Sequence, residues 1–281
     1  MLYLLLAIAS SAMVSVCMRI SEKHVRSTMV MFTANYAVCL IISRLSMGEI
    51  RLFAAADGMG IAVALGVMSG LMYLVNFVLL QRNIRRSGVV LSSASMKLGA
   101  VLIPVMAAVL FFREQMKWLQ LVGALFAVAA ILLINIEKGD VGHGGKKGGL
   151  LMLLLVSGLT DTMANIYDKT GTEALKNHYL FYTFLAALFL AFVMALWKRE
   201  GVRWADVGYG CLIGVPNYFS ARFLLSALGK VPAVIVYPVY SVGTIITITL
   251  VGLIAFREKL SRQKACALVL ILVALAMLNI S

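Results

Sequence analysis

Three ionisable residues lie inside long apolar stretches of the sequence, where a charge is costly unless it is paired or binds a solute. Lys97 lies within the stretch 87–111, Asp161 within 149–168 and Arg222 deep in 205–228. Two cations and one acid would leave a shared interior net positive or neutral. Such an interior favours a solute that carries a carboxylate or phosphate, held by Lys97 and Arg222.

Two of these residues have a second interpretation. Asp161 is either a static counter-ion of Lys97 or Arg222, or a carrier of coupling protons. Arg222 is either a substrate ligand or a structural residue that ties neighbouring backbone carbonyls together. It follows Pro216, which removes a backbone hydrogen bond and exposes a carbonyl. The sequence leaves both alternatives open.

Uncharged polar and aromatic residues accompany the charges. Ser93 precedes Lys97 by one helical turn, and Asn165 follows Asp161 by one turn. Aromatic faces with hydroxyl tips suit a partly polar organic solute. The expected substrate-binding residues are Lys97, Arg222, Tyr73, Asn76, Ser93, Asn217, Tyr218, Tyr237, Tyr240 and Ser241, and the expected coupling or counter-ion residues are Asp161 and Asn165.

The elements that must position these side chains are membrane-spanning helices. Hydrophobic residues make up 62% of the chain and charged residues 13%, which is far too apolar for a fold that faces water. The apolar runs are continuous rather than alternating, which excludes membrane strands. Ten of them are long enough to cross a bilayer as helices, at about 2–19, 28–47, 58–80, 87–111, 118–136, 149–168, 179–197, 205–228, 232–255 and 263–280.

The ten predicted spans divide into two related halves. A shift of 144 residues aligns Phe112-Arg113-Glu114 with Phe256-Arg257-Glu258, and Gly66 and Gly70 with Gly210 and Gly214. An odd number of spans in each half turns the second half upside down in the membrane, a recurrent plan in transporters. We therefore expect an all-α transmembrane fold of two inverted five-helix repeats, 1–136 and 149–281, joined by a Gly/Lys-rich linker at 137–148.

The two Phe-Arg-Glu motifs, each after the fourth span of its half, resemble the EamA-like family of the drug/metabolite transporter superfamily. The resemblance covers nearly the whole chain. It implies a secondary active transporter of small organic metabolites that works by alternating access. A proton-coupled exporter of neutral or cationic compounds is the alternative within this class.

Other function classes have less support. The net charge of +13 is explained by Lys and Arg clusters between the spans, so no nucleic-acid partner is expected. The four cysteines and three histidines are isolated, so neither a metal nor another cofactor is expected. A membrane enzyme or a channel is a remote alternative, because the sequence shows no nucleophile–base spacing and no selectivity-filter signature.

The expected partners are the lipid bilayer, a small-molecule substrate, and protons or a counter-substrate, with the chain acting as a monomer or homodimer. The expected location is multi-pass in a membrane, the plasma (inner) membrane if the protein is bacterial. Lys and Arg are more frequent in the odd-numbered loops, which places those loops in the cytoplasm and both termini outside. The family resemblance implies cytoplasmic termini, so the orientation stays open.

Overall fold

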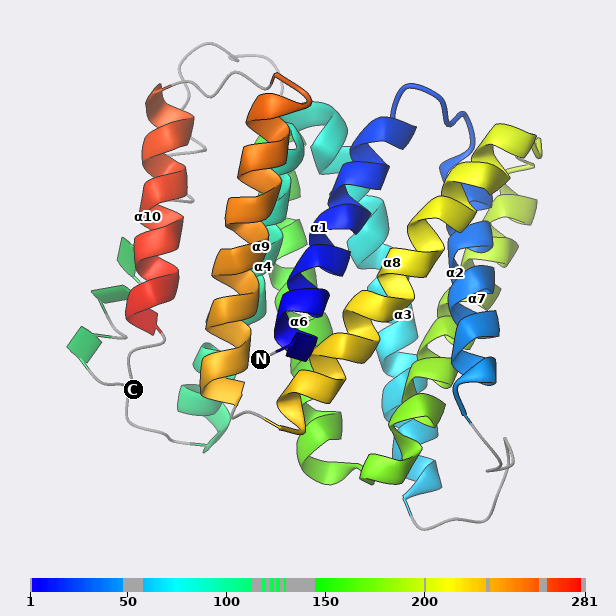
Figure 1. Cartoon of the computed structure of the whole chain (residues 1–281), viewed down its shortest axis with the longest axis horizontal. Helices are drawn as coiled ribbons and strands as arrows, with labels where there is room; N and C mark the ends of the chain where they lie inside the picture. Colours follow the sequence, from blue (N-terminus) through cyan, green and yellow to red (C-terminus); the bar gives the residue numbers. More distant parts are fainter. Residues whose placement is uncertain are drawn as a thin grey trace. The chain divides into compact units, whose positions relative to one another are not determined.

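The structure is a computed structural model. It describes residues 2–47, 58–112, 145–199, 201–230, 233–257 and 262–278, with a few positions between 118 and 129. Within these residues the chain is helical and contains no strand, which confirms the predicted all-α class (Figure 1). The helices are α1 (Leu2–Ser21), α2 (Thr28–Leu45), α3 (Met59–Ser87), α4 (Val89–Phe112), α6 (Gly145–Thr170), the 3-10 turn η1 (Glu173–Leu175), α7 (Lys176–Trp197), α8 (Trp204–Leu228), α9 (Ala233–Ile254) and α10 (Arg262–Leu278).

Nine of the ten predicted spans correspond to helices among these residues, and the fifth, 118–136, lies largely outside them. Two boundaries differ from prediction by four residues or more, the end of α3 and the start of α6. Helix α3 continues to Ser87 through a charged segment predicted to be a loop, because Arg and Gln are good helix formers. It ends before Gly88, whose φ of 85° requires glycine. Helix α6 begins at Gly145, within the predicted linker, of which residues 137–144 lie outside the described part.

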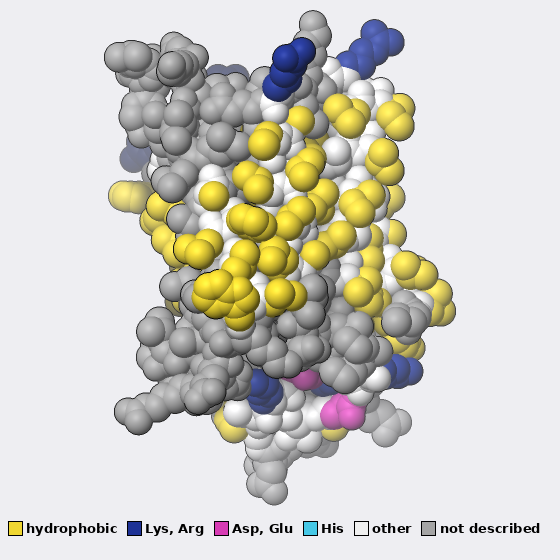
Figure 2. All heavy atoms as spheres, turned by 90° about the vertical axis from the view of Figure 1, so that its left-hand side faces the viewer, with side chains coloured by type: hydrophobic (Ala, Val, Ile, Leu, Met, Phe, Trp, Pro, Cys, Tyr) yellow, Lys and Arg dark blue, Asp and Glu magenta, His cyan; other side chains and the backbone are white. Residues whose placement is uncertain are grey.

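Six helices are long and apolar enough to cross a membrane: Leu2–Ser21, Thr28–Leu45, Met59–Ser87, Gly148–Thr170, Glu173–Trp197 and Trp204–Leu228. Two shorter apolar helical segments, Val89–Ile103 and Val239–Ile254, accompany them among the described residues. Large hydrophobic side chains are exposed along the described helices. Figure 2 shows hydrophobic side chains gathered on one face of the molecule, the side on which α10 lies in Figure 1. The chain is therefore compatible with a multi-pass membrane protein.

The helices form two compact units. Unit 1 consists of 1–78 and 163–230, and unit 2 of 79–162 and 231–281. Each unit takes segments from both predicted repeats, because spatial contacts and not chain order define it. Unit 1 contains α1, α2, α7, α8 and parts of α3 and α6. Unit 2 contains α4, α9, α10 and the remaining parts of α3 and α6.

In unit 1, two glycines allow α8 to approach α2 closely. A Cβ added at Gly210 would overlap the backbone oxygen of Met31, and one at Gly214 would overlap that of Asn35. Small residues four apart permit this kind of backbone approach between membrane helices. The polar side chains of α2 and α8 are thereby brought within hydrogen-bonding distance.

The aligned glycines of α3 make the same contacts with α7. A Cβ at Gly66 would meet the Tyr179 oxygen and the Thr183 nitrogen, and one at Gly70 would meet the Thr183 oxygen. At Gly210 the corresponding atoms are the Met31 oxygen and the Asn35 nitrogen. The glycine pairs that the 144-residue shift aligned thus occupy matching environments, Gly66 and Gly70 against α7 and Gly210 and Gly214 against α2.

Candidate functional site

The candidate site in unit 2 begins with a close crossing of α4 and α6. A Cβ at Gly99 would overlap the Leu154 carbonyl, and one at Gly158 would overlap the side chain of Ile103. The Ser157 hydroxyl also donates to the Met96 carbonyl oxygen at 2.8 Å. The crossing therefore lies next to Lys97 on α4 and three residues before Asp161 on α6.

Lys97 is buried at this crossing, with 3% of its surface exposed. Its ammonium nitrogen lies 3.7 Å from the centroid of the Tyr240 ring of α9, a cation–π geometry. The Lys97 charge also interacts electrostatically with Asp161, which is half-buried. Three residues predicted from separate spans thus interact in unit 2: the Tyr240 ring lies over the Lys97 ammonium, and Asp161 acts on that ammonium through its charge.

Hydroxyl groups of α9 lie along the same part of unit 2. Ser241 and Thr244 are fully buried, and their hydroxyl oxygens have no hydrogen-bond partner within the described residues. Ser93 is also fully buried, one turn before Lys97. The side chain of Tyr237 lies outside the described part of the chain. Thr244 was not predicted, although its position one turn after Ser241 could have indicated it.

Arg222 is bound near the ends of helices in unit 1. Its guanidinium donates to the Asn177 side-chain oxygen at the start of α7. Asn177 in turn donates through Nδ2 to the Ser46 carbonyl at the end of α2, at 2.6 Å. This chain of bonds ties α8, α7 and α2 together. The guanidinium is thus held by a side-chain amide, rather than by the backbone carbonyls of the structural interpretation, and it lies at the level of helix ends in unit 1.

The middle of unit 1 holds a polar cluster without formal charge. Asn217 of α8 donates to the Asn35 side-chain oxygen at 3.3 Å and contacts the Cys39 sulfur at 3.5 Å. The Cys39 thiol also lies 3.2 Å from the Gly214 carbonyl oxygen. Asn35 and Cys39 of α2 were not predicted as site residues. Asn35 was detectable as the one amide within the predicted span 28–47.

Aromatic rings surround this cluster. The ring centroid of Tyr73 lies 6.1 Å from that of Phe77, in a stacked pair, and 5.9 Å from that of Phe184, in an edge-to-face pair. The ring centroids of Phe184 and Tyr218 are 6.2 Å apart. The Tyr218 hydroxyl and the Asn76 side-chain oxygen are buried and have no hydrogen-bond partner among the described residues. The predicted residues Tyr73, Asn76, Asn217 and Tyr218 are therefore neighbours in one unit, and Asn165 lies half-buried on the part of α6 that belongs to it.

The described residues contain no group of three or more His, Cys, Asp or Glu side chains arranged to hold a metal ion. The described side chains at the two interiors offer an ammonium, a carboxylate, hydroxyls, amides, a thiol and aromatic faces. Such groups bind and orient polar solutes.

Comparison with known proteins finds one protein that is similar in sequence and one that is similar in fold. An uncharacterized protein from Haemophilus influenzae is 26% identical over 194 residues, which cover 66% of this chain and 65% of the relative. A solved crystal structure of a protein superposes with a TM-score of 0.63 at 16% identity, covering 98% of this chain and 94% of that one. At this identity the likeness concerns the fold alone. No family model matches the sequence.

Proposed function

We propose that the protein is a secondary active transporter of small organic solutes bearing a carboxylate or phosphate. The observation that carries the proposal is the Lys97 ammonium, buried in an apolar helix against Tyr240 and close to Asp161. An ionisable group at such depth in a membrane helix is costly and commonly belongs to a solute or ion pathway. An anionic solute would compensate the ammonium by a charge-assisted hydrogen bond.

The matching glycine contacts support the second part of the proposal, that the chain is an inverted repeat. The pair Gly66 and Gly70 packs on α7 as the pair Gly210 and Gly214 packs on α2. Exchange of packing partners between halves is expected of two repeats related by a two-fold axis. Inverted repeats of ten helices, a place in the EamA-like drug/metabolite transporters and alternating access between the halves are parts of this proposal. A plasma-membrane location in a bacterial cell follows from it.

Transport is tested with the full chain reconstituted in liposomes. We expect labelled succinate, glutamate or glycerol 3-phosphate to exchange against the same unlabelled compound inside the vesicles. Lys97→Ala should lower the initial rate at least about tenfold, because one charge-assisted bond contributes roughly 1.5–3 kcal/mol. Lys97→Arg should retain part of the rate. Lys169→Ala, at an exposed lysine on α6, is the control and should leave the rate unchanged.

The competing function is a proton-coupled exporter of neutral or cationic compounds. Asp161, whose charge interacts with Lys97, would carry the coupling protons. If Asp161→Asn abolishes pH-driven uptake of a cationic probe such as tetraphenylphosphonium while its exchange survives, the exporter is favoured. If Lys97→Ala leaves anion exchange unchanged, the anion proposal is wrong.

A further inference from the structure

Four helix ends meet at one end of unit 1: the C-terminal ends of α1 and α7 and the N-terminal ends of α2 and α8. The Asp206 carboxylate of α8 accepts from the Arg26 backbone nitrogen at 2.9 Å and the Ser27 nitrogen at 3.3 Å, just before α2. His24 stacks on Tyr209 at 5.4 Å. Met29, Val30 and Ala195 form a small buried cluster that joins α2 to α7. These contacts hold the α1–α2 and α7–α8 connections side by side.

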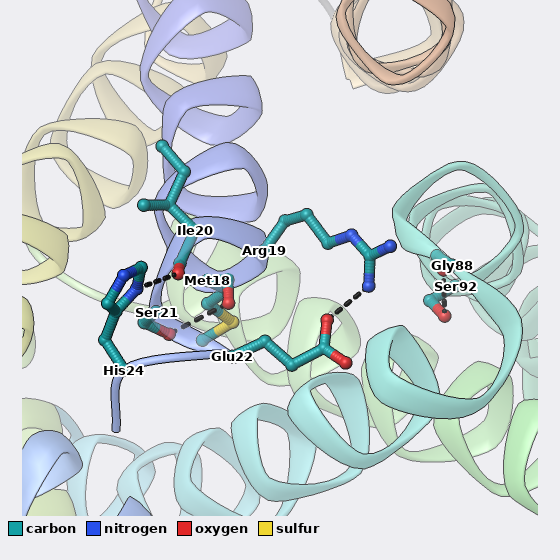
Figure 3. Close-up of polar contacts among 8 residues, drawn as sticks. All are labelled: Met18, Arg19, Ile20, Ser21, Glu22, His24, Gly88 and Ser92. Atoms are coloured by element: carbon teal, nitrogen blue, oxygen red, sulfur yellow. Dashed lines mark hydrogen bonds and ion pairs between the residues drawn. The ribbon is translucent and has the colours of Figure 1, made fainter. Parts of the chain in front are cut away.

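The carboxylates at this end are already engaged. Asp206 is fully buried against the backbone of α2. Glu22 forms an ion pair with Arg19, three residues before it (Figure 3). The described charges that remain exposed at this end of unit 1 are all positive. We call these five residues the basic rim: Lys23, Arg26, Lys198, Arg199 and Arg203.

Large apolar side chains are exposed beside the basic rim. Trp197 at the end of α7 is 83% exposed, and Trp204 at the start of α8 is 88% exposed. Val202 between them is 74% exposed. Tryptophan at a helix end prefers the boundary between headgroups and hydrocarbon. A free anion would satisfy the cations but not the apolar side chains, whereas a phospholipid offers both kinds of group.

We propose that the basic rim and the two tryptophans bind the headgroups of anionic phospholipids, which fixes this end of unit 1 in the anionic leaflet. The phosphates pair with Lys198, Arg199 and Arg203, while the rings of Trp197 and Trp204 lie at the level of the lipid glycerol. Each basic residue next to a membrane raises the affinity for anionic lipid about fivefold. This inference does not depend on the transported solute.

The test uses quenching of tryptophan fluorescence by brominated lipid in the full chain. Trp118→Phe removes the one other tryptophan, so that only Trp197 and Trp204 report. In vesicles of phosphatidylcholine and phosphatidylglycerol, brominated phosphatidylglycerol should quench more strongly than brominated phosphatidylcholine at equal mole fraction. The difference should shrink in 0.5 M NaCl, because salt screens exposed charges. Added inorganic phosphate at constant ionic strength should not reduce it, which separates lipid from free phosphate as the ligand.

Two matched variants locate the site. In the rim variant, Lys198→Gln, Arg199→Asn and Arg203→Gln remove three exposed charges. Asparagine suits the positive φ of 51° at position 199. The control variant, Arg44→Gln with Lys169→Gln and Lys230→Gln, removes three exposed charges at the opposite helix ends of unit 1. The rim variant should lose most of the phosphatidylglycerol preference, on the order of 100-fold in relative affinity, and the control variant should keep it.

Three outcomes would overturn the inference. The first is equal quenching by both lipids in the parent protein. The second is an unchanged preference in the rim variant. The third is an equal loss in the control variant, which would mean that overall charge and not this surface selects the lipid. Size-exclusion chromatography of each variant establishes that the chain remains folded.

Discussion

The interiors of the two units differ in charge, although both are built from apolar helices that cross at glycines. In unit 2 the crossing of α4 and α6 places an ammonium, a carboxylate and an aromatic ring together, at Lys97, Asp161 and Tyr240. In unit 1 the crossing of α2 and α8 brings together Asn35, Cys39 and Asn217, none of which is charged. Two charged residues of unit 1 are bound near helix ends instead, Arg222 by Asn177 and Asp206 by backbone nitrogens before α2.

The difference shows that a close approach of two helices does not determine which kinds of side chain lie at their crossing. Glycines allow backbones to meet in both units, but among the described residues only the crossing in unit 2 has a buried ammonium beside it. The buried carboxylate of unit 1, Asp206, is bound by backbone nitrogens at a helix end. The energy of a buried charge changes strongly when an ion of opposite sign binds beside it. Amides and thiols contribute only the modest energy of interhelical hydrogen bonds. We therefore expect substitutions in unit 2 to affect both stability and transport, and those in unit 1 to affect mainly packing.

The largest effect is expected when one member of the charged group is removed. Asp161→Leu should lower the free energy of unfolding by about 3 kcal/mol, because Lys97 is left buried without its carboxylate. Thermal unfolding in detergent, followed by tryptophan fluorescence, measures the loss. The double variant Lys97→Met with Asp161→Leu should recover most of it. A double variant as unstable as the single one would mean that the two charges do not compensate each other.

The next effect concerns the matching glycines of unit 1. Gly70→Ala and Gly210→Ala should each cost about 2 kcal/mol, since the added methyl overlaps a backbone carbonyl oxygen. Gly60→Ala and Gly208→Ala are controls on the same two helices, where a Cβ meets nothing within 4 Å. The controls should be neutral or slightly stabilising because alanine favours helix. If one of the two variants, Gly70→Ala or Gly210→Ala, lost almost no stability, the two glycine contacts would not be equivalent, which contradicts the proposed repeat.

A smaller effect is expected from the uncharged cluster. Asn217→Leu should cost about 1 kcal/mol, the usual scale of interhelical hydrogen bonds in membranes. Asn76→Leu should be neutral or stabilising, since its side-chain oxygen has no partner among the described residues. Unfolding of both variants in the same detergent gives the comparison. If Asn76→Leu also slows exchange of the transported solute without loss of stability, the predicted solute contact of Asn76 gains support.

The smallest effect is expected at Tyr240, where two variants distinguish the contribution of the ring from that of the hydroxyl. Tyr240→Phe keeps the aromatic face over Lys97 and should cost less stability than removal of the whole ring. Tyr240→Leu removes the face and should cost about 1–2 kcal/mol. Denaturation midpoints of the two variants, measured side by side, test this order. Equal losses would indicate that the ring acts only as apolar packing and not through its π face.

The sequence by itself predicted the helices well, because the apolar runs that span a membrane are a local property of the chain. Residue for residue, the predicted span 205–228 matches α8 to within one position, and 179–197 ends where α7 ends. The sequence also showed that Lys97 and Asp161 lie inside apolar runs, since such a charge is visible without a structure. Their roles in a solute site stay predictions. The predicted end of α3 and the predicted start of α6 were wrong by several residues. In α3 the helix continues because Arg and Gln are good helix formers, whereas the Gly-rich start of α6 has no such explanation.

Only the tertiary structure decided which side chains meet, because these contacts join residues far apart in the chain. No local pattern could pair Arg222 with Asn177, or bring Asp206 to the backbone that precedes α2. The same holds for the Tyr240 ring over Lys97 and for the Asn35 side chain against Asn217. Helix periodicity assigns a residue to a face, but the packing of distant helices determines which partner covers that face.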